Sequence, residues 1–300
     1  MQISTNTFFR QQSENIVDLK TQTASLEEKV ATGKQVTKPS DDPVSFSAIS
    51  ILKARQSRIE QYQKTSQSLN QRLSTEDSVL TQVTNILTRV QELTIQAAND
   101  TYSPEDRKSI GAEITSLHDE LISLANTKSA DGNFLFSGYL ADKQPFATKN
   151  NQTVYSGDTG RMSLTIADDT EMEVSSSGQE VFMAVKTAGG KTKSLFEIVG
   201  AIRDKLAAGQ TPISGLGDLQ NASEHINGFH AITGARQARV NSNIETLASD
   251  MLATKSRMSL LEDTDIEKAI TELKQKMTSL DAAQSSFVRI SNLSLFNYLK

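Results

Sequence analysis

Both ends of the chain carry apolar residues at alternating steps of three and four positions. This alternation is typical of a coiled-coil seam, which a helix covers by packing against another helix. We therefore expect the two ends to pair with each other and with neighbouring molecules, as the ends of an assembly subunit would. The first stripe consists of Phe9, Gln12, Ile16, Leu19, Thr23, Leu26 and Val30, and the second of Ile266, Ile270, Leu273, Met277, Leu280, Gln284 and Phe287.

The same spacing predicts long helices in the interior of the chain. The first covers about residues 44–98, and its two heptad columns are interrupted by Ser66 and Glu76. A polar residue in a seam costs stability but fixes the register of the paired helices. A second long helix is predicted at about residues 219–261, where the same alternation resumes.

Two polar segments separate the terminal stripes from the interior helices. Pro39, Asp41, Asp42 and Pro43 mark the first, where we expect a turn, then Asp42 as helix N-cap and Pro43 as the first helical residue. A charged contact of the two aspartates in an assembly is an alternative that capping does not exclude. The second is residues 262–265, where the stripe shifts by one position and thereby predicts a break.

The periodicity changes in the middle of the chain. A third helix is predicted after Ser103, which is followed by proline and two acidic residues. Residues 153–155, 162–166 and 171–174 then alternate as short strands do. A short amphipathic helix is expected at 194–208.

Together these elements predict a mainly α fold with a β insertion. It would be an elongated coiled-coil helical bundle, formed by the N- and C-terminal segments, with a small α+β outer domain in the middle. We expect the terminal helices to be mobile in the monomer and to become ordered on assembly. The predicted parts are terminal coiled-coil helices at 1–43 and 262–300, a central helical bundle at 44–138 and 228–261, and an outer insertion at 139–227.

Composition narrows the class of protein. The 300 residues include no Cys and carry a formal net charge of −5 at pH 7. Disulfides and thiolate metal sites are therefore excluded, and the basic face of a nucleic-acid binder is not expected. There is no apolar run long enough to span a membrane, and the first residues lack the features of a cleaved signal peptide. We expect neither nucleic acid nor a membrane as a partner.

The sequence offers no group of residues that we would assign to catalysis, to a cofactor or to a metal. His225 and His230 are five positions apart, a spacing that does not place two zinc ligands on one helix face. Residues 188–192 look like the end of a phosphate-binding loop, but Val185 stands where that loop needs its first glycine. We predict that the protein is not an enzyme and has no cofactor.

Several segments resemble the bacterial flagellin family, and together they cover roughly residues 1–180 and 230–300. No role is assigned to residues 184–227. The segments that carry the resemblance are Leu26–Lys34 with Pro39–Pro43, Arg89–Asn99, Asp106–Glu113, Leu124–Asn126 with Phe134–Gly138, Tyr155–Asp158, Arg236–Leu247, Glu262–Asp265 and Ser294–Leu299.

The resemblance implies an axial structural subunit of the bacterial flagellum. Such a subunit is exported through the type III apparatus without a cleaved signal peptide and lies outside the cell, at the hook–filament junction. The implied partners are further copies of the chain in a ring or helical assembly, hook-associated protein 1, flagellin and an export chaperone. A filament-forming flagellin, or a secreted coiled-coil adhesin or effector, are the alternatives.

We place the assembly interface on the terminal stripes as a hypothesis. The turn around Pro39, Asp41, Asp42 and Pro43 would act as the hinge. The interface residues would be Phe9, Ile16, Leu19, Leu26, Ile270, Leu273, Met277, Leu280, Phe287 and Leu295.

Overall fold

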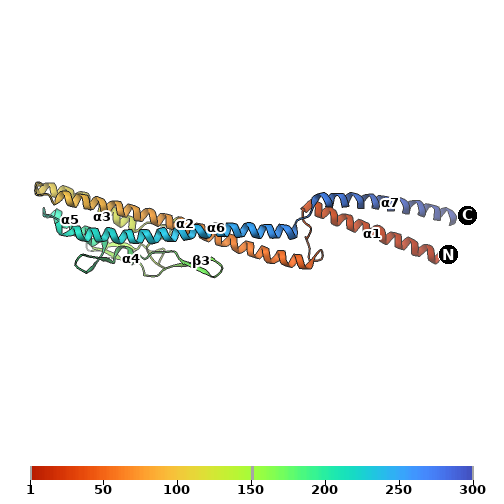
Figure 1. Cartoon of the computed structure of the whole chain (residues 1–300), viewed down its shortest axis with the longest axis horizontal. Coiled ribbons are helices and arrows are strands. Elements are labelled where there is room, and N and C mark those ends of the chain that lie inside the picture. The colour runs from red at the N-terminus through yellow and green to blue at the C-terminus, as the bar shows by residue number, and fades with distance from the viewer. Residues whose placement is uncertain (1, 150–151, 299–300) are drawn as a thin grey trace. The chain divides into compact units, whose positions relative to one another are not determined.

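The computed structural model describes the backbone of residues 2–149 and 152–298 and the side chains of residues 7–149 and 152–291 (Figure 1). The helices are α1 (Gln2–Thr32), α2 (Pro43–Ala97), α3 (Pro104–Ala125), α4 (Gly178–Phe182), α5 (Leu195–Ala207), α6 (Leu216–Glu262) and α7 (Ile266–Tyr298), with one 3-10 turn at Ile213–Gly215. The strands are β1 (Phe146–Lys149), β2 (Gln152–Tyr155), β3 (Ser163–Ala167), β4 (Thr170–Glu173), β5 (Val185–Lys186) and β6 (Thr192–Lys193).

Helices dominate the fold, and the strands are confined to its middle. The strands pair only with their neighbours in sequence, as the antiparallel hairpins β1–β2, β3–β4 and β5–β6. The prediction of a mainly α fold with a strand-containing middle is therefore confirmed. The helix break predicted at residues 262–265 is confirmed as well, because α6 ends at Glu262 and α7 begins at Ile266.

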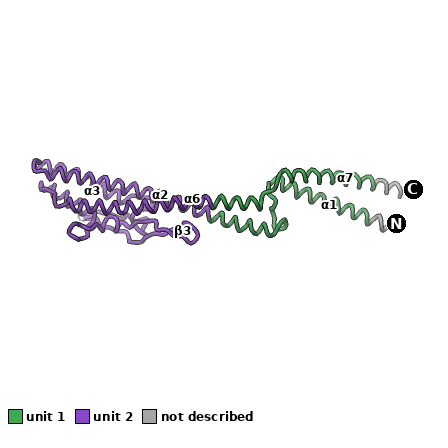
Figure 2. Tube along the Cα trace, viewed as in Figure 1, with its two compact units in different colours: residues 1–58, 250–300 green, residues 59–249 purple. Residues whose placement is uncertain are grey.

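The chain divides into two compact units (Figure 2). Unit 1 comprises residues 1–58 and 250–300, and therefore contains α1, α7 and one end each of α2 and α6. Unit 2 comprises residues 59–249. The finer three-part division that the sequence suggests stays a prediction.

In unit 2, α2 packs along α6 through the heptad columns that the sequence shows. Leu73, Leu80 and Leu87 of α2 are fully buried. The two polar interruptions are buried as well, and each meets a polar group of α6. Ser66 Oγ accepts a hydrogen bond from Asn243 at 3.1 Å, and Glu76 Oε1 accepts one from Thr233 at 3.2 Å. These pairs give Ser66 Oγ and Glu76 Oε1 partners on α6, while Glu76 Oε2 is buried without one, and they fix the register of α2 against α6.

Aromatic rings join the middle region to the helices. Phe182 of α4 lies 5.0 Å from Phe136, 5.4 Å from Phe146 and 5.9 Å from Phe196, between ring centroids. All four rings are buried, and they belong to the same apolar cluster as the seam of α2 and the buried face of α3. Because this cluster draws on α2, α3, α4 and α5, the strand-containing region shares its core with the helices.

Local signals explain where the shorter helices begin. Ser103 Oγ accepts a hydrogen bond from the Asp106 amide while Asp106 accepts one from the Ser103 amide, which forms a capping box at the start of α3. Ser194 and Glu197 repeat this arrangement at the start of α5. Both helices therefore begin where a serine lies three residues before an acidic side chain.

We predict that Phe182→Ala lowers the free energy of unfolding by about 3–5 kcal/mol, because it leaves a cavity among three other rings. Chemical denaturation followed by circular dichroism measures the loss. Ile95→Ala is the matched control, since Ile95 is an exposed apolar residue of α2, and its effect should stay within about 0.5 kcal/mol. Equal losses in the two variants would contradict a shared aromatic core.

Candidate functional site: the terminal helices and their junction

The described residues show no arrangement that suggests catalysis. Among them, no three His, Asp or Glu side chains lie together as metal ligands. No helix in the described part of the chain is both long and apolar enough to cross a membrane. The candidate site that the terminal stripes indicate is a surface for association, built from α1, α7 and the segments that join them to α2 and α6.

α1 and α7 lie side by side in opposite directions within unit 1 (Figure 1). The ring of Phe9 meets that of Phe287 edge to face, with 5.7 Å between centroids. The seam residues of α1 are the ones that the three–four spacing identifies, and the seam of α7 faces them. The predicted interface residues that lie half-buried in this seam are Phe9, Ile16, Leu19, Leu26, Leu273, Leu280 and Phe287.

Two predicted interface residues lie outside the seam. Ile270 and Met277 are 37% and 46% exposed, whereas the buried side of α7 passes through Ala269 instead. The predicted C-terminal stripe therefore combines two faces of α7, because small residues such as Ala269 let the helices approach at positions that an apolar pattern alone does not reveal. The side chain of Leu295 lies outside the described residues.

Four of the five large exposed apolar residues among the described side chains of α7 share one face of the helix, and Ile290 lies on another. At 3.6 residues per turn, Ile266, Ile270, Met277 and Val288 fall within about 40° of one another around the axis. Their exposed fractions run from 37% to 56%. We call these four residues the outer stripe. It flanks the seam with α1, so α7 has a second apolar face that α1 does not cover.

The pairing of α1 with α7 leaves most of their side chains partly exposed. Thr23 and Ala269 are the only buried residues of these two helices among the side chains that are described, at 6% and 5% exposed. Two helices form a single layer, and such a layer leaves each seam side chain partly in water. Further packing partners would therefore stabilise the pair.

A buried carboxylate holds the junction together. Glu262, the last residue of α6, accepts a hydrogen bond on Oε1 from Lys34 Nζ at 2.7 Å and from Lys53 Nζ at 3.0 Å. Its side chain is only 8% exposed. Burial raises the pKa of Glu262, but the two lysine ammonium groups outweigh it, so the pKa lies below its ordinary value.

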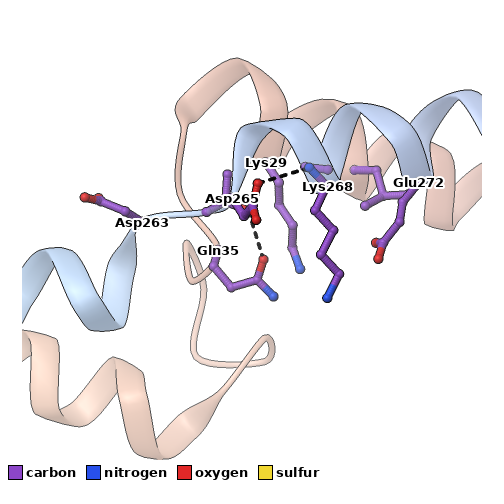
Figure 3. Close-up of a pocket in the computed structure, with 9 residues that line it drawn as sticks. Lys29, Gln35, Asp263, Asp265, Lys268 and Glu272 are labelled. Atoms are coloured by element: carbon purple, nitrogen blue, oxygen red, sulfur yellow. Dashed lines mark hydrogen bonds between the residues drawn. The ribbon is translucent and has the colours of Figure 1, made fainter.

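Backbone hydrogen bonds cross the same junction. The Gln35 amide donates to the carbonyl of Glu262 at 2.7 Å, and the Thr264 amide donates to that of Gly33 at 2.9 Å. Gly33 has φ +70°, a left-handed conformation that ends α1 and that glycine adopts without strain. Beside these bonds lies a cavity of about 300 Å³, whose lining includes Lys268 and Glu272 (Figure 3).

The Pro39–Pro43 turn is ordered by its aspartates, as the sequence predicts. Asp42 Oδ1 accepts hydrogen bonds from the amides of Val44 and Ser45 at 3.0 and 3.1 Å, which caps α2. Asp41 Oδ2 accepts from the amides of Thr37 and Lys38, both at 3.0 Å. The Ser45 hydroxyl also donates to Asp42 Oδ2 at 2.6 Å, and this bond together with the amides lowers the pKa of Asp42, while the amides of Thr37 and Lys38 lower the pKa of Asp41. The capping role is therefore present, and a contact in an assembly stays a prediction.

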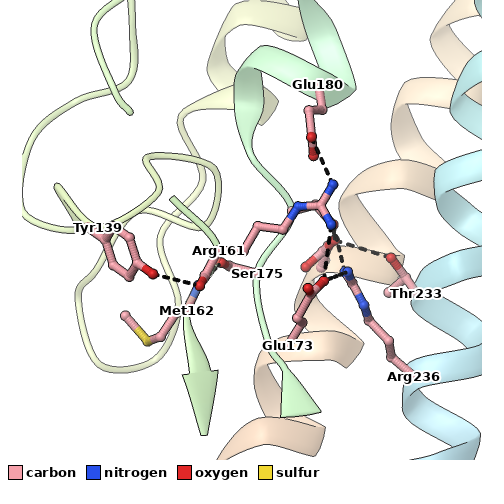
Figure 4. Close-up of polar contacts among 10 residues, drawn as sticks. Tyr139, Arg161, Met162, Glu173, Ser175, Glu180, Thr233 and Arg236 are labelled. Carbon is pink, nitrogen blue, oxygen red and sulfur yellow. Dashed lines mark hydrogen bonds and ion pairs between the residues drawn. The ribbon is translucent and has the colours of Figure 1, made fainter. Parts of the chain in front are cut away.

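A second buried carboxylate lies in unit 2. Glu76 Oε1 accepts hydrogen bonds from the hydroxyls of Ser176, at 2.7 Å, and Thr233, and Arg236 donates to the Ser176 hydroxyl at 3.0 Å. Glu173 adds an ion pair with Arg236 at 3.4 Å (Figure 4). Burial raises the pKa of Glu76, and its hydrogen bonds and Arg236 only partly oppose this. The cluster joins α2, α6 and the middle region, so we interpret it as structural.

The sequence pattern did not identify Lys34, Lys53 and Glu262 as a group. The phase shift after α6 places Glu262 at a helix end, but nothing in the spacing indicates that its carboxylate is buried. Lys34 and Lys53 lie more than two hundred positions away from it. Only the folded chain brings the three together.

Comparison with known proteins identifies the class of this chain. Residues 3–141 match the bacterial flagellin N-terminal helical region, and residues 216–299 match the bacterial flagellin C-terminal helical region. The chain belongs to the bacterial flagellin family. These two regions contain α1 to α3, α6 and α7, so the family match covers every helix of the candidate site.

Within the family, the chain is similar over its whole length to hook-associated proteins. It is 29% identical to flagellar hook-associated protein 3 of Salmonella typhimurium, over 99% of each chain. It is 25% identical to a flagellin of Listeria monocytogenes, over 86% of this chain and 88% of the flagellin. The crystal structure of hook-associated protein 3 from Legionella pneumophila covers 71% of this chain and 98% of its own, with a TM-score of 0.66 at 20% identity.

We predict that Glu76→Gln changes how stability depends on pH. Because Glu76 holds its proton more tightly when folded than when unfolded, the wild type loses stability as pH rises from about the ordinary value of 4.5. Glutamine keeps the acceptor oxygen but does not titrate. The difference in unfolding free energy, wild type minus variant, should therefore fall with rising pH, by at most about 1.4 kcal/mol per pH unit.

Urea denaturation at pH 4.5, 6 and 7.5 measures this difference. Glu171→Gln, an exposed carboxylate of β4, is the control and should show a smaller dependence on pH. A difference for Glu76→Gln that stays constant across the three values would contradict a raised pKa.

Proposed function

We propose that this chain is a structural subunit of the bacterial flagellum, located at the hook–filament junction between hook-associated protein 1 and the flagellin filament. Full-length similarity to a hook-associated protein 3 supports this position. The chain acts by packing against copies of itself and against other axial subunits, and it catalyses no reaction. It works outside the cell, after export with the help of a chaperone and without a cleaved signal peptide.

The observation that carries the proposal is the incomplete burial of α1 and α7. Their seam is half-buried within one chain, and the outer stripe of α7 is exposed beside it. Burying a fully exposed side chain of this size is worth about 1.5–3 kcal/mol, and Met277, which is 46% exposed, would gain about half of that. A neighbouring subunit that covered the outer stripe would gain this energy and would complete the core that a two-helix layer lacks.

The predicted interface residues then have two different roles. Residues such as Leu280 and Phe287 hold α7 against α1 in one chain, and neighbouring subunits close over them. Ile270 and Met277, which face outward, make the contact between subunits. This division follows from burial and applies to the described side chains alone.

A filament-forming flagellin is the second candidate, since a flagellin of Listeria monocytogenes also aligns with most of the chain. The two candidates differ in self-assembly. A flagellin polymerises into long fibres by itself, whereas a junction subunit needs its neighbours on both sides. Electron microscopy of the concentrated protein distinguishes them, and long fibres would favour flagellin.

Deleting the gene for this chain tests the junction role in cells. We expect the cells to build hooks, to bear no filaments and to release flagellin into the medium, because the filament has nothing to start on. Complementation with the wild-type chain should restore filaments. Normal filaments on the deleted cells would exclude the junction role.

We predict that Met277→Asp blocks incorporation into the flagellum and leaves the monomer intact. The aspartate would place a charge in the buried contact between subunits, and the lost burial and the buried charge together correspond to at least about a tenfold weaker association. Because Met277 is exposed in the monomer, the free energy of unfolding should change by no more than about 0.5 kcal/mol.

The matched control is Gln275→Asp, which adds the same charge at an exposed position on the opposite face of α7. Immunoblots of purified flagella and of the culture medium compare incorporation with export. The proposal expects Met277→Asp to be exported but not incorporated, and Gln275→Asp to be incorporated. Equal incorporation of the two variants would count against the outer stripe as an interface.

A further inference from the structure

A small cavity lies in unit 2, where α3, α5 and β2 meet. Its volume is about 180 Å³. His118 of α3 lines it, together with Thr153 of β2 and with Gly200 and Arg203 of α5. The cavity shares no lining residue with the association surface of the terminal helices, and the proposed function makes no use of it.

His118 is buried beside this cavity with an unpaired ring nitrogen. Its side chain is 10% exposed, and Nδ1 has no hydrogen-bond partner among the described residues. Asp119 Oδ1 lies 3.6 Å from Nδ1, which is too far for a hydrogen bond. A buried polar atom without a partner is costly, and one explanation for it is a water or an ion that completes its contacts.

The missing side chain of Gly200 leaves a space between two basic groups. A Cβ atom at Gly200 would lie 3.8 Å from Arg203 Nη2 and 3.9 Å from His118 Nε2. Two nitrogens from different helices therefore border one point in the cavity. An oxyanion carries several oxygen atoms, so it can accept one hydrogen bond from each of them.

The two carboxylates that line the cavity are already engaged. Glu197 Oε2 accepts a hydrogen bond from the Ser194 amide at 2.9 Å, at the start of α5. Asp204 Oδ1 accepts from Arg203 Nε at 2.9 Å, and the side chain of Asp204 is 63% exposed, so water screens its charge. Arg203 is only 16% exposed and keeps N–H groups that Asp204 does not use.

We propose that this cavity binds a small oxyanion, which His118 Nε2 and Arg203 hold from α3 and α5. Its volume admits only a small ligand, and its two nitrogens suit the oxygen atoms of a sulfate-like or carboxylate group. The bound ion ties α5 to α3, which gives a role to part of residues 184–227. This site goes beyond the proposed function and does not depend on it.

Binding of the anion is coupled to a proton on His118. Burial and the neighbouring Arg203 lower the pKa of His118, while Asp119 and the Phe196 carbonyl oppose this shift. An anion favours the imidazolium, in which Nε2 donates to the ligand and Nδ1 carries a proton toward Asp119. The anion therefore raises the pKa of His118, and a lower pH tightens binding.

NMR of the imidazole rings, on the free full-length chain, tests the site. His118, His225 and His230 are the only histidines of the chain, so the other two are internal controls. Sodium sulfate and sodium acetate are each titrated at pH 6 against sodium chloride of equal ionic strength. The His118 signals alone should move, with half-saturation at roughly 1–10 mM, the range that two charge-assisted hydrogen bonds provide.

The two anions distinguish the possible ligands. A response to sulfate indicates a tetrahedral ion, and a response to acetate alone indicates a carboxylate. At saturation, the pKa of His118 read from its ring signals should lie above its value in sodium chloride, whereas the pKa values of His225 and His230 should not change.

Gly200→Ala fills the space with a methyl group. Because 3.8 and 3.9 Å are ordinary van der Waals distances and alanine favours a helix, the variant should melt no lower than the wild type. Its half-saturation should rise by at least about tenfold, since the anion loses its place between the two nitrogens. Gly228→Ala is the matched control in α6, where an added Cβ has open space around it, and it should bind as the wild type does.

A saturable response of His118 that Gly200→Ala loses and Gly228→Ala keeps supports the site. No saturable response to either anion, equal movement of all three histidines, or an unchanged response in Gly200→Ala would overturn it. If Gly200→Ala melts below the wild type, Arg203→Gln decides instead. Loss of the response in that variant supports the site, and a retained response overturns it.

Discussion

A helix with an apolar stripe along one side is stable in water only where another surface covers that stripe, and the architecture of this chain follows from that constraint. In unit 2 the stripe of α2 is covered by α6, and α3, α4 and α5 extend the same core. In unit 1 the stripes of α1 and α7 cover each other only in part. The same kind of pattern therefore gives a closed core in one unit and an open one in the other.

Buried polar groups determine which of the available pairings forms. Leucines and valines in a seam would tolerate several registers, but Ser66 and Glu76 meet their hydrogen-bond partners Asn243 and Thr233 in only one. Glu262 does the same at the junction, where its two lysines come from different segments. Such groups add little net stability, and their main effect is to exclude alternatives.

Much of the fold was predictable from periodicity, because helices of this length repeat their pattern many times. The seam of α1 and the heptads of α2 are where the sequence places them, and the break before α7 is too. The pattern of α7 was harder to read, because Ala269 carries little apolar signal although it packs against α1, while Ile270 carries a strong signal and faces outward. The contacts of Glu262 could not be predicted, since its lysine partners are distant in sequence and belong to no repeating pattern.

The pairing of α1 with α7 also orders events in time. The rings of Phe9 and Phe287 are in contact, yet Phe9 is synthesised near the start of translation and Phe287 near its end. A ribosome completes α1 first and α7 last, so α1 leaves the ribosome long before its partner exists. During that interval its stripe is open to any other apolar surface. A chaperone that covers the stripe of α1, or passage of the unfolded chain through a narrow channel, would prevent premature aggregation.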